Sequence, residues 1–184
     1  MKKLSDLEHT ILGIVFKRGP CTPYLVAREF LNSPSSHWRG SAGSVYPAVT
    51  KLHRIGFLKK TIGKSLGRRC SLFTLAPKGL KQLQSWLMPP LPEAAASITF
   101  DPLRTRSFFL RVLSPEQQLA FFDDAEKQLL AQLPALQADC EAYREAGDWH
   151  SEQAQIGTLL VTEARLAWVR QYRRALQSQT TKSE

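Results

Sequence analysis

The sequence of 184 residues has little that would mark an enzyme, a metalloprotein or a membrane protein. It lacks a glycine-rich phosphate loop, a nucleophile elbow and a paired-carboxylate motif, so we expect no enzymatic activity. Its four histidines do not have the spacing of metal ligands, and we expect neither a metal nor a cofactor. No apolar run approaches the roughly 18 to 20 residues that cross a bilayer, so the sequence predicts no membrane partner.

Cysteine is also scarce. The three cysteines are Cys21, Cys70 and Cys140. They are too few and too widely spaced for a disulfide framework or a zinc site, and this usage is typical of reduced thiols. The N-terminus has two lysines before an apolar stretch, as a signal peptide does, but Asp6 and Glu8 interrupt that stretch. We therefore expect a cytoplasmic protein.

Acidic residues are rare in only one part of the chain. Residues 1–88 hold fifteen lysines and arginines against Asp6, Glu8 and Glu29, a net charge of +12. Residues 89–184 hold ten against thirteen acids, a net charge of −3. A solubilising surface would not need such segregation. The distribution predicts that the first part binds a polyanion and the second does something else.

Local signals in the basic part predict three helices. Ser5 and Glu8 form a capping box for a helix that ends at Gly19, and Thr22 followed by Pro23 begins a short second helix. Apolar residues then recur at the spacing of one helical face. They are Val45, Ala48, Val49, Leu52 and Ile55.

This third helix contains a proline near its start. If Ser44 is the N-cap, Pro47 is the third helical residue, where its missing N–H has no intrahelical partner to lose. Gly56 supplies the left-handed position that ends the helix. We therefore expect the helix to begin no earlier than about Gly43.

A β-hairpin follows the third helix. The β-prone runs 57–61 and 70–75 flank a predicted turn at 62–69, which carries cations at its tip. Pro77 opens a fourth helix, and the proline-rich stretch 88–97 marks a boundary.

The remaining residues read as helices. Asp101-Pro102 and Ser114-Pro115 are helix starts, Pro134 should kink or split the second of these helices, and a last helix covers about 151–176. Long apolar stripes need cover, and a second copy of the chain is the simplest partner, so we predict a homodimer. The predicted dimerisation residues are Leu159, Leu160, Leu166, Val169, Tyr172 and Leu176.

These patterns predict a mainly α fold, with an N-terminal winged helix-turn-helix and a C-terminal helical dimerisation domain. The predicted domains are 1–88 (DNA binding), 89–101 (linker), 102–178 (dimerisation and effector binding) and 179–184 (disordered tail). A winged helix lays its third helix in the DNA major groove, so double-stranded DNA is the expected partner. The predicted DNA-binding residues are Ser41, Gly43, Ser44, Tyr46, Thr50, Lys51, Arg54, Lys59, Lys60, Lys64, Arg68 and Arg69.

Three stretches resemble the PadR family of transcriptional regulators: "LSDLEHTILGIVFKRGPCTPYLVAREF", "SAGSVYPAVTKLHRIGFLKK" and "GRRCSLFTLAPKGLKQLQSWL". The entry to the third helix, Ser41-x-x-Ser44-Val-Tyr-Pro47, is the most specific part. The chain departs from the family at 23–25, where relatives have Gly-Tyr-Glu, and at 76–77, where they have Thr-Pro. The resemblance covers residues 4–88 and implies a dimeric repressor, less often an activator. If the protein is a two-fold dimer, a palindromic operator is expected.

The resemblance also implies that some relatives bind small aromatic effectors. The candidate effector-binding residues are Phe108, Phe109, Phe122, Trp149 and Trp168, expected between the two domains. The alternative is that these side chains fill the core or the dimer interface.

Three further alternatives stay open at this point. A winged helix can serve as a protein-interaction module without reading DNA, although such a module does not need a charge of +12. RNA binding has less support, because no aromatic pairs stand on exposed strands. Tyr46 can lie at the DNA or pack against the hairpin, and Trp38 is expected to be a packing residue.

Overall fold

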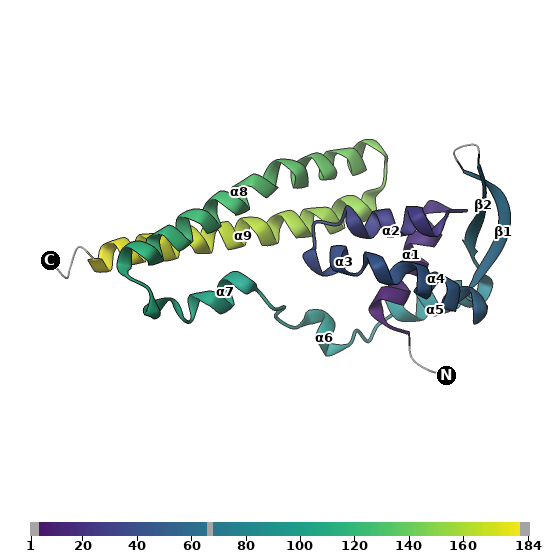
Figure 1. The fold of residues 1–184 in the computed structure, drawn as a ribbon, viewed down its shortest axis with the longest axis horizontal. Helices are drawn as coiled ribbons and strands as arrows, with labels where there is room; N and C mark the ends of the chain where they lie inside the picture. The colour runs from purple at the N-terminus through teal and green to yellow at the C-terminus, as the bar shows by residue number, and fades with distance from the viewer. Residues whose placement is uncertain (1–3, 66–67, 181–184) are drawn as a thin grey trace. The chain divides into compact units, whose positions relative to one another are not determined.

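The computed structural model describes residues 4–65 and 68–180 and divides the chain into two compact units, Met1–Ser97 and Ile98–Glu184 (Figure 1). The division falls inside the linker predicted at 89–101. The first unit contains α1 (Asp6–Arg18), α2 (Pro23–Leu31), α3 (Ser36–Gly40), the 3-10 turn η1 (Ala42–Ser44), α4 (Val45–Arg54), β1 (Leu58–Ser65), β2 (Arg68–Leu75), α5 (Pro77–Leu87) and α6 (Glu93–Ala96).

The first two helices begin where their caps predict. The Ser5 hydroxyl accepts the Glu8 N–H, and the Glu8 carboxylate accepts the Ser5 N–H at 2.9 Å, which completes the capping box of α1. The Thr22 side chain accepts the Leu25 N–H at the start of α2. Gly19 ends α1 with a φ of 68°, where a side chain would be strained.

The approach to α4 contains two elements that the sequence does not predict. The five residues of α3 carry Trp38, which packs edge-on against Phe30 with ring centroids 5.5 Å apart, so Trp38 is the packing residue expected of it. The turn η1 then leads directly into α4. Ser44 is the N-cap by position but makes no side-chain capping bond, and Pro47 is the third residue of α4, as expected.

The hairpin is longer than the sequence predicts. Strands β1 and β2 pair antiparallel from Leu58↔Leu75 to Ser65↔Arg68, so most of the predicted turn at 62–69 is strand. Gly67, a candidate turn residue, lies outside the described residues. At the base of the hairpin, Cys21 exchanges backbone hydrogen bonds with Phe73, which ties β2 to the segment between α1 and α2.

One apolar core holds the first unit together. Ile11, Leu12 and Val15 of α1 and the inner face of α4 are completely or almost completely buried. Helix α5 closes the core, with Leu83 buried and Gly79 lying directly against the Phe57 carbonyl. This arrangement of helices followed by a two-stranded wing confirms the predicted fold class.

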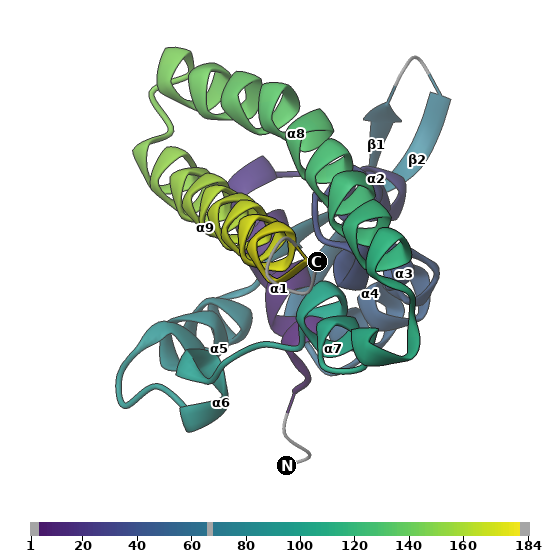
Figure 2. The same cartoon turned by 90° about the vertical axis from the view of Figure 1, so that its left-hand side faces the viewer.

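The second unit is helical throughout its described residues. It contains α7 (Pro102–Ser107), η2 (Leu110–Val112), α8 (Pro115–Glu145) and α9 (Trp149–Thr180). Figures 1 and 2 both show α8 and α9 side by side. They run antiparallel, because Glu126 pairs with Arg170 and Asp139 accepts from Gln155. Pro134 does not split α8, which remains one helix.

An N-cap on α7 also links it to α9. Asp101 accepts the backbone N–H groups of Leu103 and Arg104 and pairs with Arg165 of α9 at 2.8 Å. Burial alone would raise the pKa of the Asp101 carboxyl, but the hydrogen bonds from Arg165 and the backbone outweigh it, and the pKa lies below its ordinary value.

The structure uses much of the predicted dimerisation stripe inside a single chain. Leu166 and Val169 are buried against α8, and Tyr172 and Leu176 pack on the same core. Val169 has no exposed surface, so it cannot contact a second copy. Gln179 and Thr180, expected in a disordered tail, are the last residues of α9, and 181–184 lie outside the described residues.

Replacement of Gly79 by alanine should destabilise the protein, because its Cβ would overlap the Phe57 carbonyl oxygen. We expect a loss of about 1–3 kcal/mol in urea unfolding followed by circular dichroism. Gly157→Ala is the matched control, since nothing lies within 4 Å of its added Cβ on α9. That control should gain about 0.5–1 kcal/mol of helix propensity. Equal effects from the two substitutions would contradict this packing.

Candidate nucleic-acid interface

The exposed face of α4 is defined by what its opposite face buries. Val45, Ala48, Val49 and Leu52 point into the core. Helical geometry therefore turns the intervening residues to solvent. The exposed residues of this surface are Gly43, Ser44, Tyr46, Pro47, Thr50, His53 and Arg54. They combine hydroxyl groups, a guanidinium and an aromatic ring, which suits contacts to base edges and phosphates.

Tyr46 is 51% exposed and so is not enclosed by the hairpin. The Thr50 hydroxyl donates to the Tyr46 carbonyl at 3.0 Å, which leaves its lone pairs to accept a hydrogen bond from outside. Ser41 is only half-buried, and its hydroxyl donates to the His37 carbonyl. Of the predicted contacts on this segment, Ser41 is thus the least accessible hydroxyl.

Lys51 differs from its neighbours because it already has a partner. Its ammonium pairs with the carboxylate of Glu8 on α1, and the side chains are 38% and 7% exposed. On the helical wheel, Lys51 lies on the flank of the exposed face, with Thr50 and Arg54 nearer its centre. Sequence reasoning missed this pairing because 43 residues separate the two side chains.

The Glu8 carboxyl is ionised at neutral pH. Burial alone would raise the pKa of Glu8, but hydrogen bonds from Lys51 and from the Ser5 backbone outweigh it, so the pKa lies below its ordinary value of 4.5. Both charges also interact favourably with helix dipoles, since Glu8 is in the first turn of α1 and Lys51 is in the last turn of α4.

The hairpin carries five exposed cations, which we call the wing cations: Lys59, Lys60, Lys64, Arg68 and Arg69. Successive residues of a strand point to opposite faces, and Lys64 stands directly across from Arg69. Lys60, Lys64 and Arg69 therefore share one face of the hairpin, and Lys59 and Arg68 share the other. The wing is cationic on both sides.

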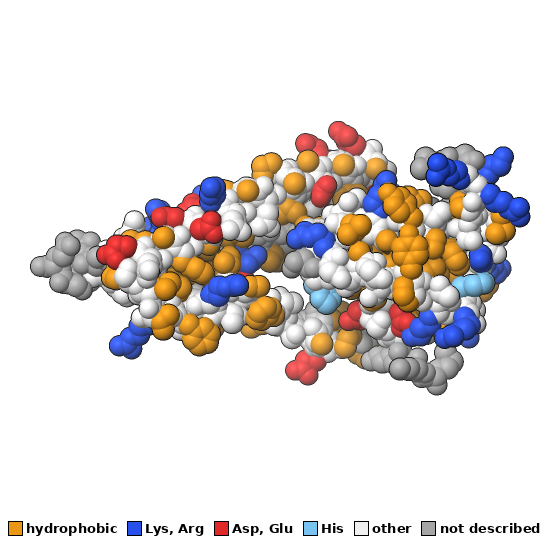
Figure 3. All heavy atoms as spheres, in the orientation of Figure 1, with side chains coloured by type: hydrophobic (Ala, Val, Ile, Leu, Met, Phe, Trp, Pro, Cys, Tyr) orange, Lys and Arg blue, Asp and Glu red, His pale blue; other side chains and the backbone are white. Residues whose placement is uncertain are grey.

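No acidic side chain neutralises the wing among the described residues. The ion pairs of the first unit join Arg18 to Glu29 and Lys51 to Glu8, and none includes a wing cation. Figure 3 shows Lys and Arg side chains gathered over β1 and β2, with no Asp or Glu side chain among them on the face that it draws. The positive field of the wing is therefore uncompensated.

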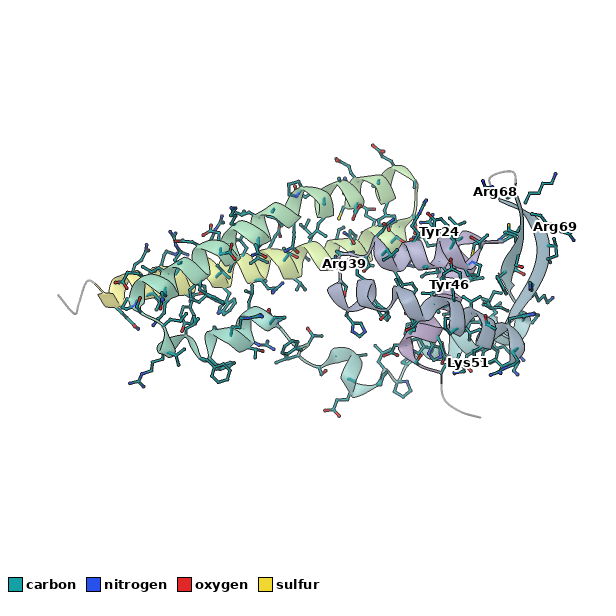
Figure 4. The ribbon with its side chains drawn as sticks, in the orientation of Figure 1. Tyr24, Arg39, Tyr46, Lys51, Arg68 and Arg69 are labelled. Carbon is teal, nitrogen blue, oxygen red and sulfur yellow. The ribbon has the colours of Figure 1, made fainter. Side chains whose placement is uncertain are left out.

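Sequence reasoning missed three exposed residues of this unit. Tyr24 is 58% exposed, and Arg28 lies one turn further along the same face of α2. Arg39 of α3 is exposed and donates to the carbonyls of Ser33 and Pro34. Tyr24, Tyr46 and the two wing arginines can be located in Figure 4. The helical spacing of the apolar residues Val26 and Phe30, which are buried, is the sequence signal that would have identified Tyr24 and Arg28 as residues of the opposite, exposed face.

The five aromatic residues predicted for an effector do not converge. Phe122 is fully buried and stacks on Tyr172 at 4.6 Å, with Trp168 beside both rings. Phe108 and Phe109 are 76% and 66% exposed. Trp149 begins α9, nineteen residues before Trp168 and hence roughly 28 Å along the helix. For Phe122 and Trp168, the core-filling alternative describes what they do in the chain.

No group of three or more metal-ligating side chains occurs in 4–65 or 68–180. Within the same residues, no helix is both long and apolar enough to span a bilayer.

The pair of Glu8 and Lys51 makes a prediction for stability. In Lys51→Met, the buried Glu8 carboxylate loses its partner, and the protein should lose about 1–3 kcal/mol at pH 7. The folded-state pKa of Glu8 is depressed, so the stability from this pair is present above pH 4.5 and is lost as pH falls through the folded value.

The difference between wild type and Lys51→Met should therefore shrink as the pH of the urea titrations falls below 4.5. Lys59→Met is the control, because it removes an exposed wing cation and should change stability by less than about 0.5 kcal/mol. A difference between wild type and Lys51→Met that did not vary with pH would contradict the role given to the Glu8 charge.

Comparison with known proteins finds similarity in structure but not in sequence. No protein-family model matches the chain, and no curated protein matches it. Crystal structures of Bacillus subtilis PadR match over nearly all of both chains. The structure in complex with operator DNA has a TM-score of 0.79 at 20% identity and covers 94% of this chain and 99% of that one. The structure in complex with p-coumaric acid has a TM-score of 0.72 at 20% identity and covers 93% and 98%.

A further match is the Vibrio cholerae virulence activator AphA, with a TM-score of 0.68 at 18% identity over 95% of this chain and 99% of that one. The similarity spans both units, including the helical region for which the sequence resemblance is weak. The chain therefore has the fold of the PadR-type transcriptional regulators.

Proposed function

We propose that the protein is a PadR-type transcriptional regulator that binds double-stranded DNA in a sequence-specific manner as a homodimer. The observation that carries this proposal is the uncompensated cationic wing beside a recognition helix whose polar face is open to solvent. In this proposal α4 enters the major groove, and the wing cations contact phosphates or the adjacent minor groove. The protein acts by binding in the cytoplasm, without catalysis.

The wing carries cations on both faces, an arrangement that suits insertion into a DNA groove with a phosphate strand on each side. A hairpin with cations on only one side can neutralise one phosphate strand, whereas Lys64 and Arg69 on one face and Lys59 and Arg68 on the other can meet both strands bordering it. In a helix-turn-helix the helix that precedes the recognition helix crosses the DNA backbone. We therefore add Tyr24 and Arg28 of α2, and Arg39, to the proposed phosphate contacts.

Charge reversal on the wing should weaken DNA binding broadly rather than change its sequence preference. We expect Arg68→Glu and Arg69→Glu each to lower affinity for operator and non-operator duplexes alike, and to reduce the slope of log K against log salt by about 1–2. Arg111→Glu, the same change on the exposed η2 turn of the second unit, is the control. Electrophoretic mobility shifts across a salt series would measure this. Equal slopes for all four proteins would contradict the wing contacts.

The rival function is a winged helix that binds a protein. Binding to duplex DNA that weakens steeply with salt favours the DNA function, and competition by duplex RNA would identify an RNA-binding protein instead. We propose repression as the mode of action, following the family resemblance. Because AphA is named an activator, transcription from a reporter promoter decides the sign.

The homodimer needs a surface that the chain does not cover itself. Leu160 and Val161 of α9 are 58% and 61% exposed, and we place them in the dimer interface together with the half-buried Leu159. A two-fold dimer would present two α4 helices to half-sites about 10 base pairs apart, or a multiple of that, so a palindromic operator is expected.

Charges at these positions should dissociate the dimer. We expect Leu160→Glu and Val161→Glu to shift the protein toward monomers in sedimentation velocity and to weaken operator binding, because a monomer holds only one half-site. Gln153→Glu adds the same charge at an exposed polar position of α9 and is the control. A dimer unaffected by both substitutions would place the interface elsewhere.

A small aromatic effector remains a second proposal. A B. subtilis PadR structure with the same fold is described in complex with p-coumaric acid. The exposed rings of Phe108, Phe109 and Trp149 are the candidates here, since Phe122 and Trp168 are occupied in the core. Titration of phenolic acids against the protein–operator complex would test this effect.

A further inference from the structure

We infer that Glu8 limits the sequence-independent affinity of the protein for DNA, by cancelling the charge of Lys51 on the recognition helix. This inference rests on the proposed DNA-binding function and assigns a role to a residue outside the surface that faces DNA. In the structure, the buried carboxylate of Glu8 on α1 forms an ion pair with Lys51 on α4.

Both oxygens of Glu8 are engaged. Oε2 accepts the Ser5 N–H at 2.9 Å, and Oε1 pairs with the Lys51 ammonium. The side chain is only 7% exposed, so water has little access to the carboxylate. The carboxylate is therefore a fixed negative charge at the edge of the recognition helix, and Lys51 is held toward it.

Lys51 could otherwise reach DNA. Its side chain is 38% exposed, it follows Thr50 directly, and it lies on the flank of the face that carries Thr50 and Arg54. An ammonium group has three donors, and Glu8 satisfies one of them. Figure 4 shows Lys51 on the side of α4 away from Arg68 and Arg69 near the tip of the wing.

The ion pair of Glu8 and Lys51 has no net charge, and the affinity for non-specific DNA depends on the positive charge that a protein brings to the phosphates. Each phosphate that a free cation neutralises releases counterions and adds about 0.9 to the salt slope, whatever the base sequence. A lysine whose charge is balanced by Glu8 releases almost no counterions and so adds almost nothing to the salt slope. Its pairing lowers affinity for all DNA, while Tyr46, Thr50 and Arg54 remain free to read base edges.

Among the described residues, no other acid of the first unit forms an ion pair with a residue of α4. Residues 4–88 contain only Asp6, Glu8 and Glu29. Glu29 of α2 pairs with Arg18 of α1 at 2.6 Å, so it balances a cation outside the recognition helix. Glu8 is the acid that pairs with a residue of α4, and the charge that α4 presents to DNA depends on it.

The test uses full-length protein and two variants, Glu8→Gln and Glu8→Gln/Lys51→Gln. The first keeps an oxygen for the Ser5 N–H and frees Lys51. The second replaces the ion pair by two amides of similar shape, which protects the fold if the single variant proves unstable. Circular dichroism verifies folding, and fluorescence anisotropy measures binding to operator and to random duplex across a salt series.

We expect Glu8→Gln to bind random duplex more tightly, with a salt slope steeper by about 0.9, and the double variant to have the wild-type slope. The advantage of Glu8→Gln over wild type should fall about threefold between roughly 50 and 200 mM salt, for operator and random duplex alike. Thermal stability alone would not distinguish this role from a structural clamp, whereas the salt slope does.

Two results would overturn the inference. An unchanged slope in Glu8→Gln would make Glu8 only a clamp between α1 and α4. A slope shallower by about 1 in the double variant would make Lys51 a phosphate contact in the wild type. Wild-type protein that binds no duplex would instead refute the proposed function, and the inference with it.

Discussion

The burial of one face of α4 is the constraint on which the rest of the first unit depends. Each valine or leucine of that face contributes roughly 1.5–3 kcal/mol when it leaves water, and Val45, Val49 and Leu52 are at most 1% exposed. A rotation of α4 by one residue would expose them and bury polar groups. The core therefore fixes which side chains of the helix face outward. It also holds them on a rigid element, which precise recognition of a binding partner requires.

Electrostatics then separates the wing from part of the helical body. Arg18 and Lys51 on the helices have carboxylates beside them, while the wing cations have none among the described residues. The wing projects from the core as a two-stranded ribbon, so its alternating side chains occupy both faces. The strongest unbalanced charge is thus carried by the element with the freest access to a polyanion.

The elements that sequence reasoning located are those whose signals are local. Capping boxes and proline at the first helical position mark α1, α2, α5, α7 and α8, because the signal and the structure lie within one turn. Helix α3 was missed because five residues are too few to show a period. The wing was predicted too short, since pairing between strands overrides the turn propensity of Gly63 and its neighbours.

By itself the sequence determined the concentration of positive charge in the first 88 residues, the helix starts and the inner face of α4, since each follows from composition or from residues within a few positions of one another. Only the tertiary structure decided which neighbours those residues meet. It paired Lys51 with Glu8 across 43 residues, and it covered the apolar stripe of α9 with α8 of the same chain. Periodicity shows that a face must be buried, but not by what, because the partner is chosen by packing in three dimensions.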